Sequence, residues 1–257
     1  MTRAIRLEVC VDTAEGLDIA TKHGADRIEL CASLSVGGLT PSVGMMHLAA
    51  QSQCLTRAMV RPREGDFVYD DVEVTLMMHD IDAVAAVGLN GVVLGANRAT
   101  GELDERVLGK LIEHAKLAGL QITLHRAFDV APDLPAALTM AQSLGIDSIL
   151  TSGGAVNALQ GAETIRRLVQ LAGASPSTRG IELMAGVGVS ATTAPEIVTR
   201  SGVRWLHGSC SMPRSIDSSD AARLGYSLPT HRRTDAGAID QLRDVLGHLA
   251  RDAVAID

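Results

Sequence analysis

Hydrophobic and polar residues alternate in short stretches of this chain, and the clearest example is Arg27–Cys31. Ile28 and Leu30 form an apolar face there, whereas Arg27, Glu29 and Cys31 form a polar one, as in a β-strand with two different faces. Nearly the same pattern occurs earlier, since Leu7-Glu-Val-Cys10 parallels Ile28-Glu-Leu-Cys31. Two such strands can bring two carboxylates and two thiols together, so their polar faces are candidates for a functional site.

Strand-like and amphipathic helical stretches alternate from one end of the chain to the other. The predicted strands are Arg6–Val11, Arg27–Cys31, Thr56–Arg61, Gly91–Gly95, Gln121–His125, Ser148–Thr151, Ile181–Met184 and Arg204–His207. The predicted helices are Thr13–His23, Ser42–Gln53, Asp71–Val87, Asp104–Ala118, Leu134–Leu144, Ala158–Ala172, Ala191–Ser201 and Asp235–Ala250. Eight β/α units in 257 residues predict a (β/α)8 TIM barrel. A doubly wound open sheet is the alternative, but its GxGxxG turn is missing after the first strand.

The barrel hypothesis assigns an inner face to each strand. If the more apolar face packs against helices, the inward residues are Glu8, Cys10, Glu29, Cys31, Met59, Arg61, Thr123, His125, Glu182, Met184, Trp205 and His207. Buried carboxylates need partners, and Arg27, Arg61 and Arg126 are the expected counter-ions. Because active sites of TIM barrels lie at the C-terminal ends of the strands, this polar lining predicts a site at that rim.

Composition narrows the function classes. A net charge of −7 and five aromatic residues argue against nucleic-acid binding, which needs basic surfaces and stacking platforms. The chain has no apolar run long enough to cross a membrane and no signal-peptide pattern, so we expect a cytoplasmic protein with no membrane partner. We expect one domain over residues 1–257, with a long loop at 208–234 before the last helix.

A family resemblance is carried by several motifs in a fixed order. They are Leu7-Glu-Val-Cys-Val-Asp12, Gly24-Ala-Asp-Arg-Ile-Glu-Leu-Cys31, Gly37-Gly-Leu-Thr-Pro-Ser42, Val60-Arg-Pro-Arg63 with Gly65-Asp66, His125-Arg-Ala-Phe-Asp129 and Thr151-Ser-Gly-Gly154. Together they resemble the copper homeostasis protein CutC family. The resemblance implies a TIM barrel, a homo-oligomer (dimer or tetramer) and a role in intracellular copper handling.

The first candidate chemistry is copper binding. Cu(I) prefers soft ligands, and Cys10 and Cys31 end neighbouring predicted strands on the same face, so they are the candidate metal ligands. His125, Met184 or Cys210 could supply a third ligand. The alternative is that both thiols are small buried hydrophobic side chains, as free cysteines usually are.

The second candidate chemistry is catalysis at the same rim. Glu8, Glu29, Arg61, His125 and Asp129 form a set that could perform acid/base chemistry or hold a divalent metal, acting on a small anionic, for example phosphorylated, metabolite. His125 is the best candidate for proton transfer because its ordinary pKa is near neutrality. The alternatives are a structural ion network around the barrel mouth and a barrel that serves as an oligomeric interaction platform.

Glycine-rich turns after the late strands suggest where an anionic ligand would bind. Backbone N–H groups in such turns form the phosphate sites of many barrels. The predicted ligand-binding residues are Arg63, Arg126, Thr151, Ser152, Gly153, Gly154, Gly186 and Gly188. Each turn alone could equally be an ordinary tight turn.

Overall fold

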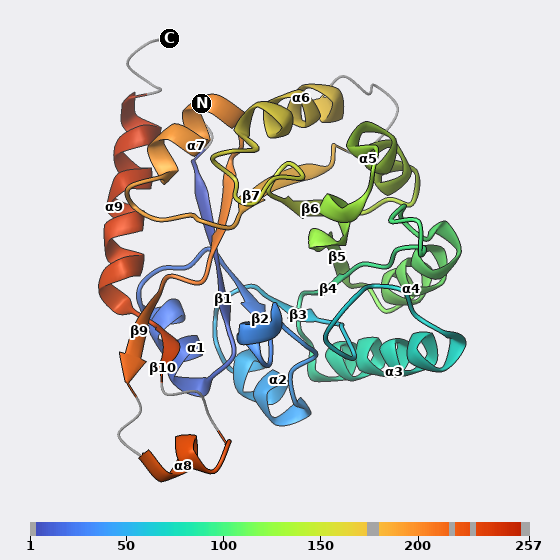
Figure 1. The fold of residues 1–257 in the computed structure, drawn as a ribbon, viewed down its shortest axis with the longest axis horizontal. Coiled ribbons are helices and arrows are strands. Elements are labelled where there is room, and N and C mark those ends of the chain that lie inside the picture. Colours follow the sequence, from blue (N-terminus) through green and yellow to red (C-terminus); the bar gives the residue numbers. More distant parts are fainter. Residues whose placement is uncertain (1–3, 174–179, 216–218, 227–229, 253–257) are drawn as a thin grey trace.

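The computed structural model describes residues 4–173, 180–215, 219–226 and 230–252 of the chain. Its centre is a closed barrel of eight parallel strands in sequential order, surrounded by helices (Figure 1). The barrel strands are β1 (Arg6–Val11), β2 (Arg27–Leu30), β3 (Thr56–Met59), β4 (Gly91–Leu94), β5 (Gln121–Leu124), β6 (Ser148–Thr151), β7 (Glu182–Gly186) and β8 (Trp205–Gly208). The predicted TIM barrel is therefore confirmed.

The helices alternate with these strands along the chain. They are α1 (Ala14–Lys22), α2 (Val43–Ala50), α3 (Asp71–Val87), α4 (Glu105–Leu117), α5 (Leu134–Ser143), α6 (Ala162–Gly173), α7 (Ala194–Ser201), α8 (Ser219–Arg223) and α9 (Ala236–Asp252), with two short 3-10 turns, η1 (Leu34–Val36) and η2 (Arg126–Val130). Helix starts follow local capping chemistry: Thr13 accepts a hydrogen bond from the Gly16 N–H, and Asp70 forms a capping box with Glu73. None of the helices in the described ranges is long and apolar enough to span a membrane.

The strands separate two environments. Their outward residues, such as Leu7, Val9, Ile28 and Leu30, are fully buried in a large apolar core under the helices. The inward residues are mostly polar or charged and yet buried, and they include Glu8, Arg27, Glu29, Arg57, Arg61, Thr123, His125, Ser148 and His207. Two small apolar clusters complete the interior: Cys31, Met59 and Val93 in one, and Leu150, Met184 and Trp205 in the other. The predicted assignment of strand faces is confirmed in this respect.

Four predicted strands extended slightly too far. β2, β3, β4 and β5 end at Leu30, Met59, Leu94 and Leu124, so Cys31, Arg61, Gly95 and His125 lie just beyond the sheet. The backbone leaves the ladder there because each strand turns into a rim loop; His125, for example, is already the cap of η2. α6 and α7 also begin later than predicted, and α7 starts beside a proline in its first turn, which favours a helix start.

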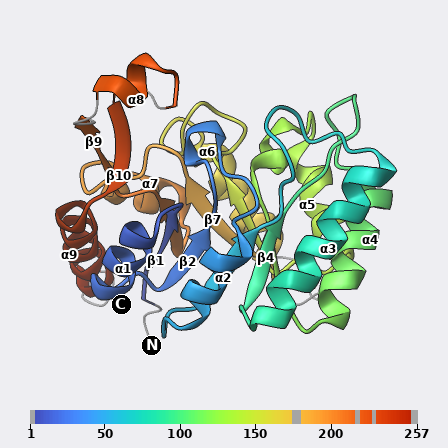
Figure 2. The same cartoon turned by 90° about the horizontal axis from the view of Figure 1, so that it is seen from below.

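The prediction of a long loop at 208–234 was wrong in part. This segment contains an antiparallel pair, β9 (Ser211–Ser215) with β10 (Thr230–Thr234), and α8 between them. Residues 216–218 and 227–229 of the segment lie outside the described ranges. The pair and α8 extend beyond the barrel at the end opposite the first residues of β1 (Figure 2).

Candidate functional site

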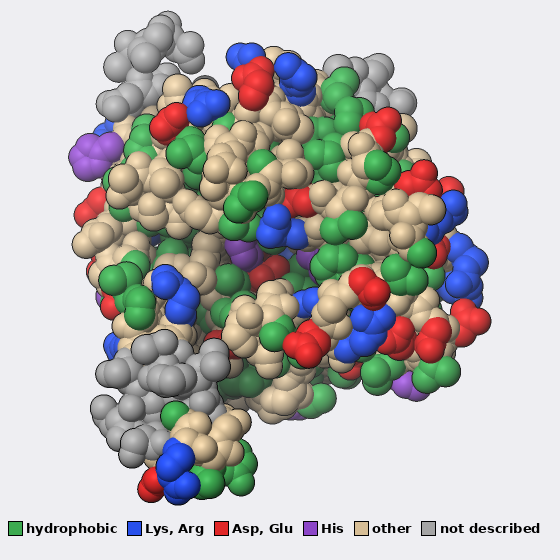
Figure 3. All heavy atoms as spheres, viewed as in Figure 1, with side chains coloured by type: hydrophobic (Ala, Val, Ile, Leu, Met, Phe, Trp, Pro, Cys, Tyr) green, Lys and Arg blue, Asp and Glu red, His purple; other side chains and the backbone are tan. Residues whose placement is uncertain are grey.

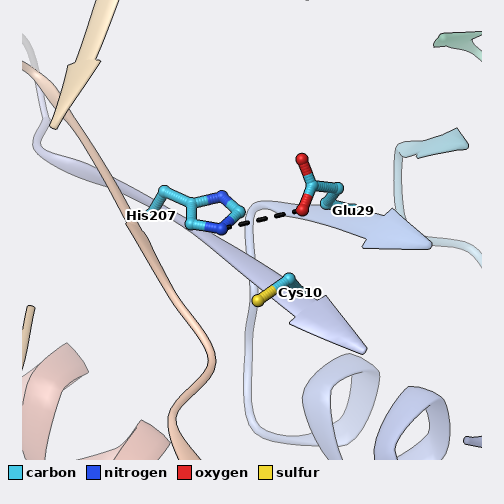
Figure 4. A group of neighbouring side chains, drawn as sticks. All are labelled: Cys10, Glu29 and His207. Atoms are coloured by element: carbon cyan, nitrogen blue, oxygen red, sulfur yellow. Dashed lines mark ion pairs between the residues drawn. The ribbon is translucent and has the colours of Figure 1, made fainter. Parts of the chain in front are cut away.

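Three side chains from three neighbouring strands meet inside the barrel. Cys10 comes from β1, Glu29 from β2 and His207 from β8 (Figure 4). β1 pairs with both other strands, with Cys10 beside Glu29 in one register and Glu8 beside His207 in the other. The sulfur, carboxylate oxygen and imidazole nitrogen that these residues offer all lie within 4.8 Å of one another, and all three residues are buried. A single ion could therefore contact all three.

Glu8 contacts the ring nitrogen of His207 that points away from Glu29. Its Oε1 lies 2.8 Å from His207 Nδ1, and its Oε2 accepts a hydrogen bond from Arg27 Nε. Burial alone would raise the pKa of the Glu8 carboxyl, but the charge of Arg27 and the contact with His207 lower it to about 2. With Nδ1 engaged by a carboxylate, the other ring nitrogen, Nε2, faces Glu29 at 3.7 Å. Metal-binding histidines are typically oriented by such a carboxylate on the distal nitrogen.

Glu29 links His207 to Cys31. Burial raises the pKa of Glu29, and its Oε2 accepts a hydrogen bond from Cys31 Sγ at 3.6 Å. The other oxygen, Oε1, is buried without a partner in the described part of the chain. Burial and the nearby Glu29 charge raise the pKa of the Cys31 thiol well above its ordinary value, and burial also raises that of Cys10. An orphaned carboxylate oxygen beside two thiols and an imidazole fits a site that receives a cation.

The floor of the site is formed by Arg27. Its guanidinium carbon lies 4.0 Å from the centroid of the Trp205 ring, and its Nη2 donates to Met184 Sδ at 3.5 Å. Its Nη1 is 3.9 Å from Glu182 Oε2. The structure thus engages Met184, a candidate third ligand, with Arg27. Cys210, another such candidate, is buried in the apolar core, and burial raises the pKa of its thiol to about 12.

A cavity of about 320 Å³ opens at the barrel mouth above these residues. Charged and histidine side chains gather in the central hollow of this face (Figure 3). Cys10, Glu29 and His207 line one side of the cavity, and Arg61, His125 and Arg126 also line it. Since β5 is the fourth strand from β1 in a barrel of eight, His125 lies across the barrel from Cys10.

Arg61 binds the loop that walls this cavity. Its Nη1 donates to the carbonyl oxygens of Val36 and Gly38, at 2.8 and 3.1 Å, and its Nη2 donates to that of Gly65 at 2.9 Å. Phe67 packs beneath its guanidinium at 5.1 Å. Arg61 therefore positions the loop that carries η1, and it forms no ion pair with a carboxylate in the described ranges.

His125 is held as a neutral imidazole. Its Nδ1 accepts a hydrogen bond from the Ala127 N–H at 3.0 Å, and its ring packs against Phe67. Burial and the charge of Arg61 lower its pKa to about 3. Because Nδ1 is an acceptor, the proton sits on Nε2, which has no hydrogen-bond partner among the described residues.

Asp129 fills the glycine-rich turn after β6. One carboxylate oxygen accepts from Thr151 Oγ1 at 2.5 Å and Gly154 N at 3.0 Å, and the other accepts from Ser152 N at 2.9 Å. Arg126 Nε donates to the same carboxylate at 2.9 Å. Gly153 N donates to Thr151 Oγ1 at 2.8 Å. The backbone donors predicted to bind an anionic ligand here are thus engaged within the protein.

The remaining predicted ligand-binding residues are Gly186 and Gly188, at and just after the end of β7, and Arg63, after β3. Gly186 ends β7 beside His207, and an added Cβ would lie 2.5 Å from a Leu150 methyl group. Gly188, with φ of 75°, lies beside Asn157. Arg63 forms ion pairs with Glu73 at 2.5 Å and Asp66 at 3.0 Å and does not line the cavity.

His207 is the residue that sequence reasoning did not select. It was assigned to the inner face but not to the candidate ligands. The signal that could have found it is barrel closure: in a closed barrel β8 must lie beside β1, so its last inward residue meets the Glu8 and Cys10 side of the interior.

The fold and the site define a TIM-barrel protein with a thiol–imidazole–carboxylate cluster at its mouth. A family model described as the CutC family matches residues 5–212. A CutC family protein from Sinorhizobium medicae is 47% identical over 97% of this chain and 99% of its own length, and one from Caulobacter vibrioides is 46% identical over 91% and 94%. The solved CutC structure from Streptococcus agalactiae, whose name assigns it provisionally to copper homeostasis, is 31% identical with a TM-score of 0.74, covering 80% of this chain and 98% of that one. The chain belongs to the CutC family.

Proposed function

We propose that this protein binds Cu(I) at the barrel mouth through Cys10 and His207, with Cys31 as the third ligand, and thereby acts in intracellular copper homeostasis. The observation that carries the proposal is the convergence of Cys10 Sγ, a His207 ring nitrogen and a Glu29 oxygen within 4.8 Å of one another. Family membership and the role given in the name of the Streptococcus agalactiae protein support copper as the ion.

The ligand types favour a soft or borderline ion. Thiolate sulfur and imidazole nitrogen suit Cu(I), whereas Mg²⁺ and Ca²⁺ prefer sites built from oxygen. Cys31 is joined to the cluster through Glu29, at 3.6 Å from its Oε2. A soft ion prefers the Cys31 thiolate to the Glu29 carboxylate, so Glu29 is a neighbour of the ion in this proposal and not a ligand. The hydrogen bond from Cys31 Sγ to Glu29 is lost when that thiol gives up its proton. A harder divalent ion would select Glu29 instead.

The ligands proposed here suit the binding of a single buried ion. Cys10 and Cys31 are 6% and 1% exposed; Cys10 lines the cavity, and Cys31 packs beside Met59 and Val93. A buried thiol must lose its proton before it ligates a metal. Glu8, on the far side of the His207 ring, keeps Nε2 directed at the ligand position.

The test is an anaerobic Cu(I) titration against a competing chelator. We expect one ion per chain for the wild type, loss of binding in Cys10→Ser, and at least tenfold weaker binding in His207→Gln and in Cys31→Ser. Cys54→Ser is the matched control, because Cys54 contacts the Ala25 carbonyl outside the cavity and should leave the affinity unchanged.

Two outcomes contradict the proposal. If the Cys10→Ser variant still binds copper, the cluster is excluded as the copper site. Stoichiometric binding of Zn²⁺ or Mn²⁺ that requires Glu29 and tolerates Cys31→Ser, with weak Cu(I) binding, would make this a divalent-metal site.

A further inference from the structure

The cavity at the barrel mouth is larger than a metal ion needs. Its volume of about 320 Å³ corresponds to about ten water molecules at their share of the liquid. Pockets of roughly 300 Å³ and above are typical of sites for small organic ligands. A Cu(I) ion bound against β1 and β8 would leave the β5 side of this space open.

The β5 side presents donors without acceptors. His125 is 4% exposed, and its protonated Nε2 has no partner among the residues described. Arg126 also lines the cavity; its Nε and Nη2 bind Asp129 and Ser152, and its Nη1 has no hydrogen-bond partner among the described residues. A buried imidazole N–H that lacks an acceptor costs free energy unless a ligand provides one.

The rest of the wall is largely apolar. It is formed by Leu34, Val36, Met59, Phe67, Leu150 and Val187. A neutral N–H donor and one guanidinium at one end of an apolar chamber match a ligand with one oxygen-bearing anionic group and a short hydrocarbon body.

The number of positive charges distinguishes a carboxylate from a phosphate. The backbone N–H groups of Ser152 and Gly154 already donate to Asp129, so they are not free to form a phosphate cradle. Arg61 uses both terminal nitrogens on backbone carbonyls. On the β5 side of the chamber, that leaves Arg126 as the cation whose guanidinium has a nitrogen without a partner among the described residues, which suits a monoanion.

We infer that the cavity binds a small monocarboxylate with an apolar body, its carboxylate received by Arg126 and by the Nε2–H of His125, beside the proposed copper ligands. The inference rests on the β5 side of the cavity and holds whether or not copper binds on the β1 side.

The test uses butanoate as the probe and metal-free full-length protein. We expect binding with a dissociation constant on the order of 1 mM, as suits six non-hydrogen atoms. The His125 Nε2 resonance should shift on titration, as followed by nitrogen-15 NMR. Butanamide, which has the same shape without the charge, and inorganic phosphate should each bind at least tenfold more weakly.

Substitutions at Arg126 and His125 test the two proposed donors, and a control substitution tests for general effects on the protein. Arg126→Gln and His125→Gln should each weaken butanoate binding at least tenfold. Arg63→Gln is the matched control, since Arg63 lies outside the cavity and should leave binding unchanged. Because butanoate is titrated into metal-free protein, failure of the copper proposal and failure of this inference give different results.

Three results would overturn the inference. They are no shift of the wild-type His125 resonance at 20-fold the expected dissociation constant, equal binding of butanoate and butanamide, and tighter binding of phosphate than of butanoate. The wild-type measurement stands even if the Arg126 variant folds poorly.

Discussion

Oε1 of Glu8 lies 2.8 Å from Nδ1 of His207, and both groups are buried inside the barrel. The contact joins the first barrel strand to the last. It directs the other ring nitrogen of His207 toward Glu29. Glu8 therefore acts on the proposed metal position through His207, without contributing a ligand atom to the cluster.

Replacing Glu8 by Gln should weaken Cu(I) binding by about 10–100-fold, the usual effect of losing a carboxylate that orients a ligating histidine. Protein stability should also fall, by about 3–5 kcal/mol, because Arg27 stays buried with its main ion partner gone. Competitive Cu(I) titration and urea denaturation measure the two effects.

Glu182→Gln is the control for the Glu8 variant. Glu182 also lies near Arg27, at 3.9 Å, but its side chain is 42% exposed. The control should change stability by less than about 1 kcal/mol and leave copper affinity alone. Equal copper affinity in Glu8→Gln and in the wild type would show that Glu8 does not orient a ligand.

Asp129 engages the backbone donors of the turn after β6 that were predicted to bind an anionic ligand. Its side chain is 6% exposed and accepts hydrogen bonds from Ser152 N, Gly154 N and Arg126. Removal of the carboxylate in Asp129→Ala should cost about 3 kcal/mol, because the buried N–H of Ser152 and the Arg126 guanidinium lose a charged acceptor. Added formate should restore part of the loss by binding to the freed donors, which thermal denaturation with and without formate would detect.

Asp133→Ala is the matched control for this rescue. Asp133 caps α5 by accepting from Ala136 N and lies four positions away in sequence. Its loss should cost about 1 kcal/mol, with no rescue by formate. Equal formate effects in both variants would refute the idea that Asp129 fills an anion cradle.

The fold and much of the interior could be predicted from sequence because the signal is local. Period-two alternation assigned Glu8, Cys10 and Glu29 to the barrel interior, and the structure places them there. The same alternation says nothing about which distant strand lies beside which. The pairing of Glu8 with His207 follows from closure of the barrel, which brings together residues near opposite ends of the chain.

Two other features were outside the range of such patterns. The position of Asp129 in the sequence predicted a carboxylate at the barrel rim. That this carboxylate binds the turn after β6 depends on the path of η2, which the sequence pattern does not give. The β9–β10 pair has no apolar face to mark its strands: β10 reads Thr-His-Arg-Arg-Thr. Its pairing with β9 is a tertiary outcome that residue propensities do not encode.

Stability should depend on pH through His125. Burial and the charge of Arg61 lower its folded-state pKa to about 3, against 6.5 as its ordinary value. Between those values the unfolded chain binds a proton that the folded chain does not, so stability is fully present above pH 6.5 and is lost as pH falls toward 3. The slope from this group approaches ~1.4 kcal/mol per pH unit.

His125→Gln isolates that contribution. Urea denaturation of the wild type and of the variant at pH 7.5, 6 and 5 gives the difference in their slopes, in which the shared carboxylates largely cancel. The variant should lose less stability than the wild type on acidification. Parallel curves would mean that His125 takes up its proton in the folded protein as readily as in the unfolded chain.

The turn that carries Arg126 and Asp129 should depend on Phe128 for its position. Phe128 lies between them in η2 and is fully buried in the apolar core under the helices. Phe128→Ala should therefore cost about 3–5 kcal/mol by lost burial and cavity formation. Phe128→Leu fills more of the space and should cost less, whereas Val130→Ala, at a position 51% exposed, should change stability by less than about 0.5 kcal/mol.

If the buried ring anchors the turn, butanoate affinity should fall in the order wild type, Phe128→Leu, Phe128→Ala. The affinities are measured at a temperature well below each variant's unfolding midpoint. If the Phe128 variants lose stability but bind butanoate as the wild type does, then the mutual hydrogen bonds of Arg126 and Asp129 position these two residues, and the core beneath them does not.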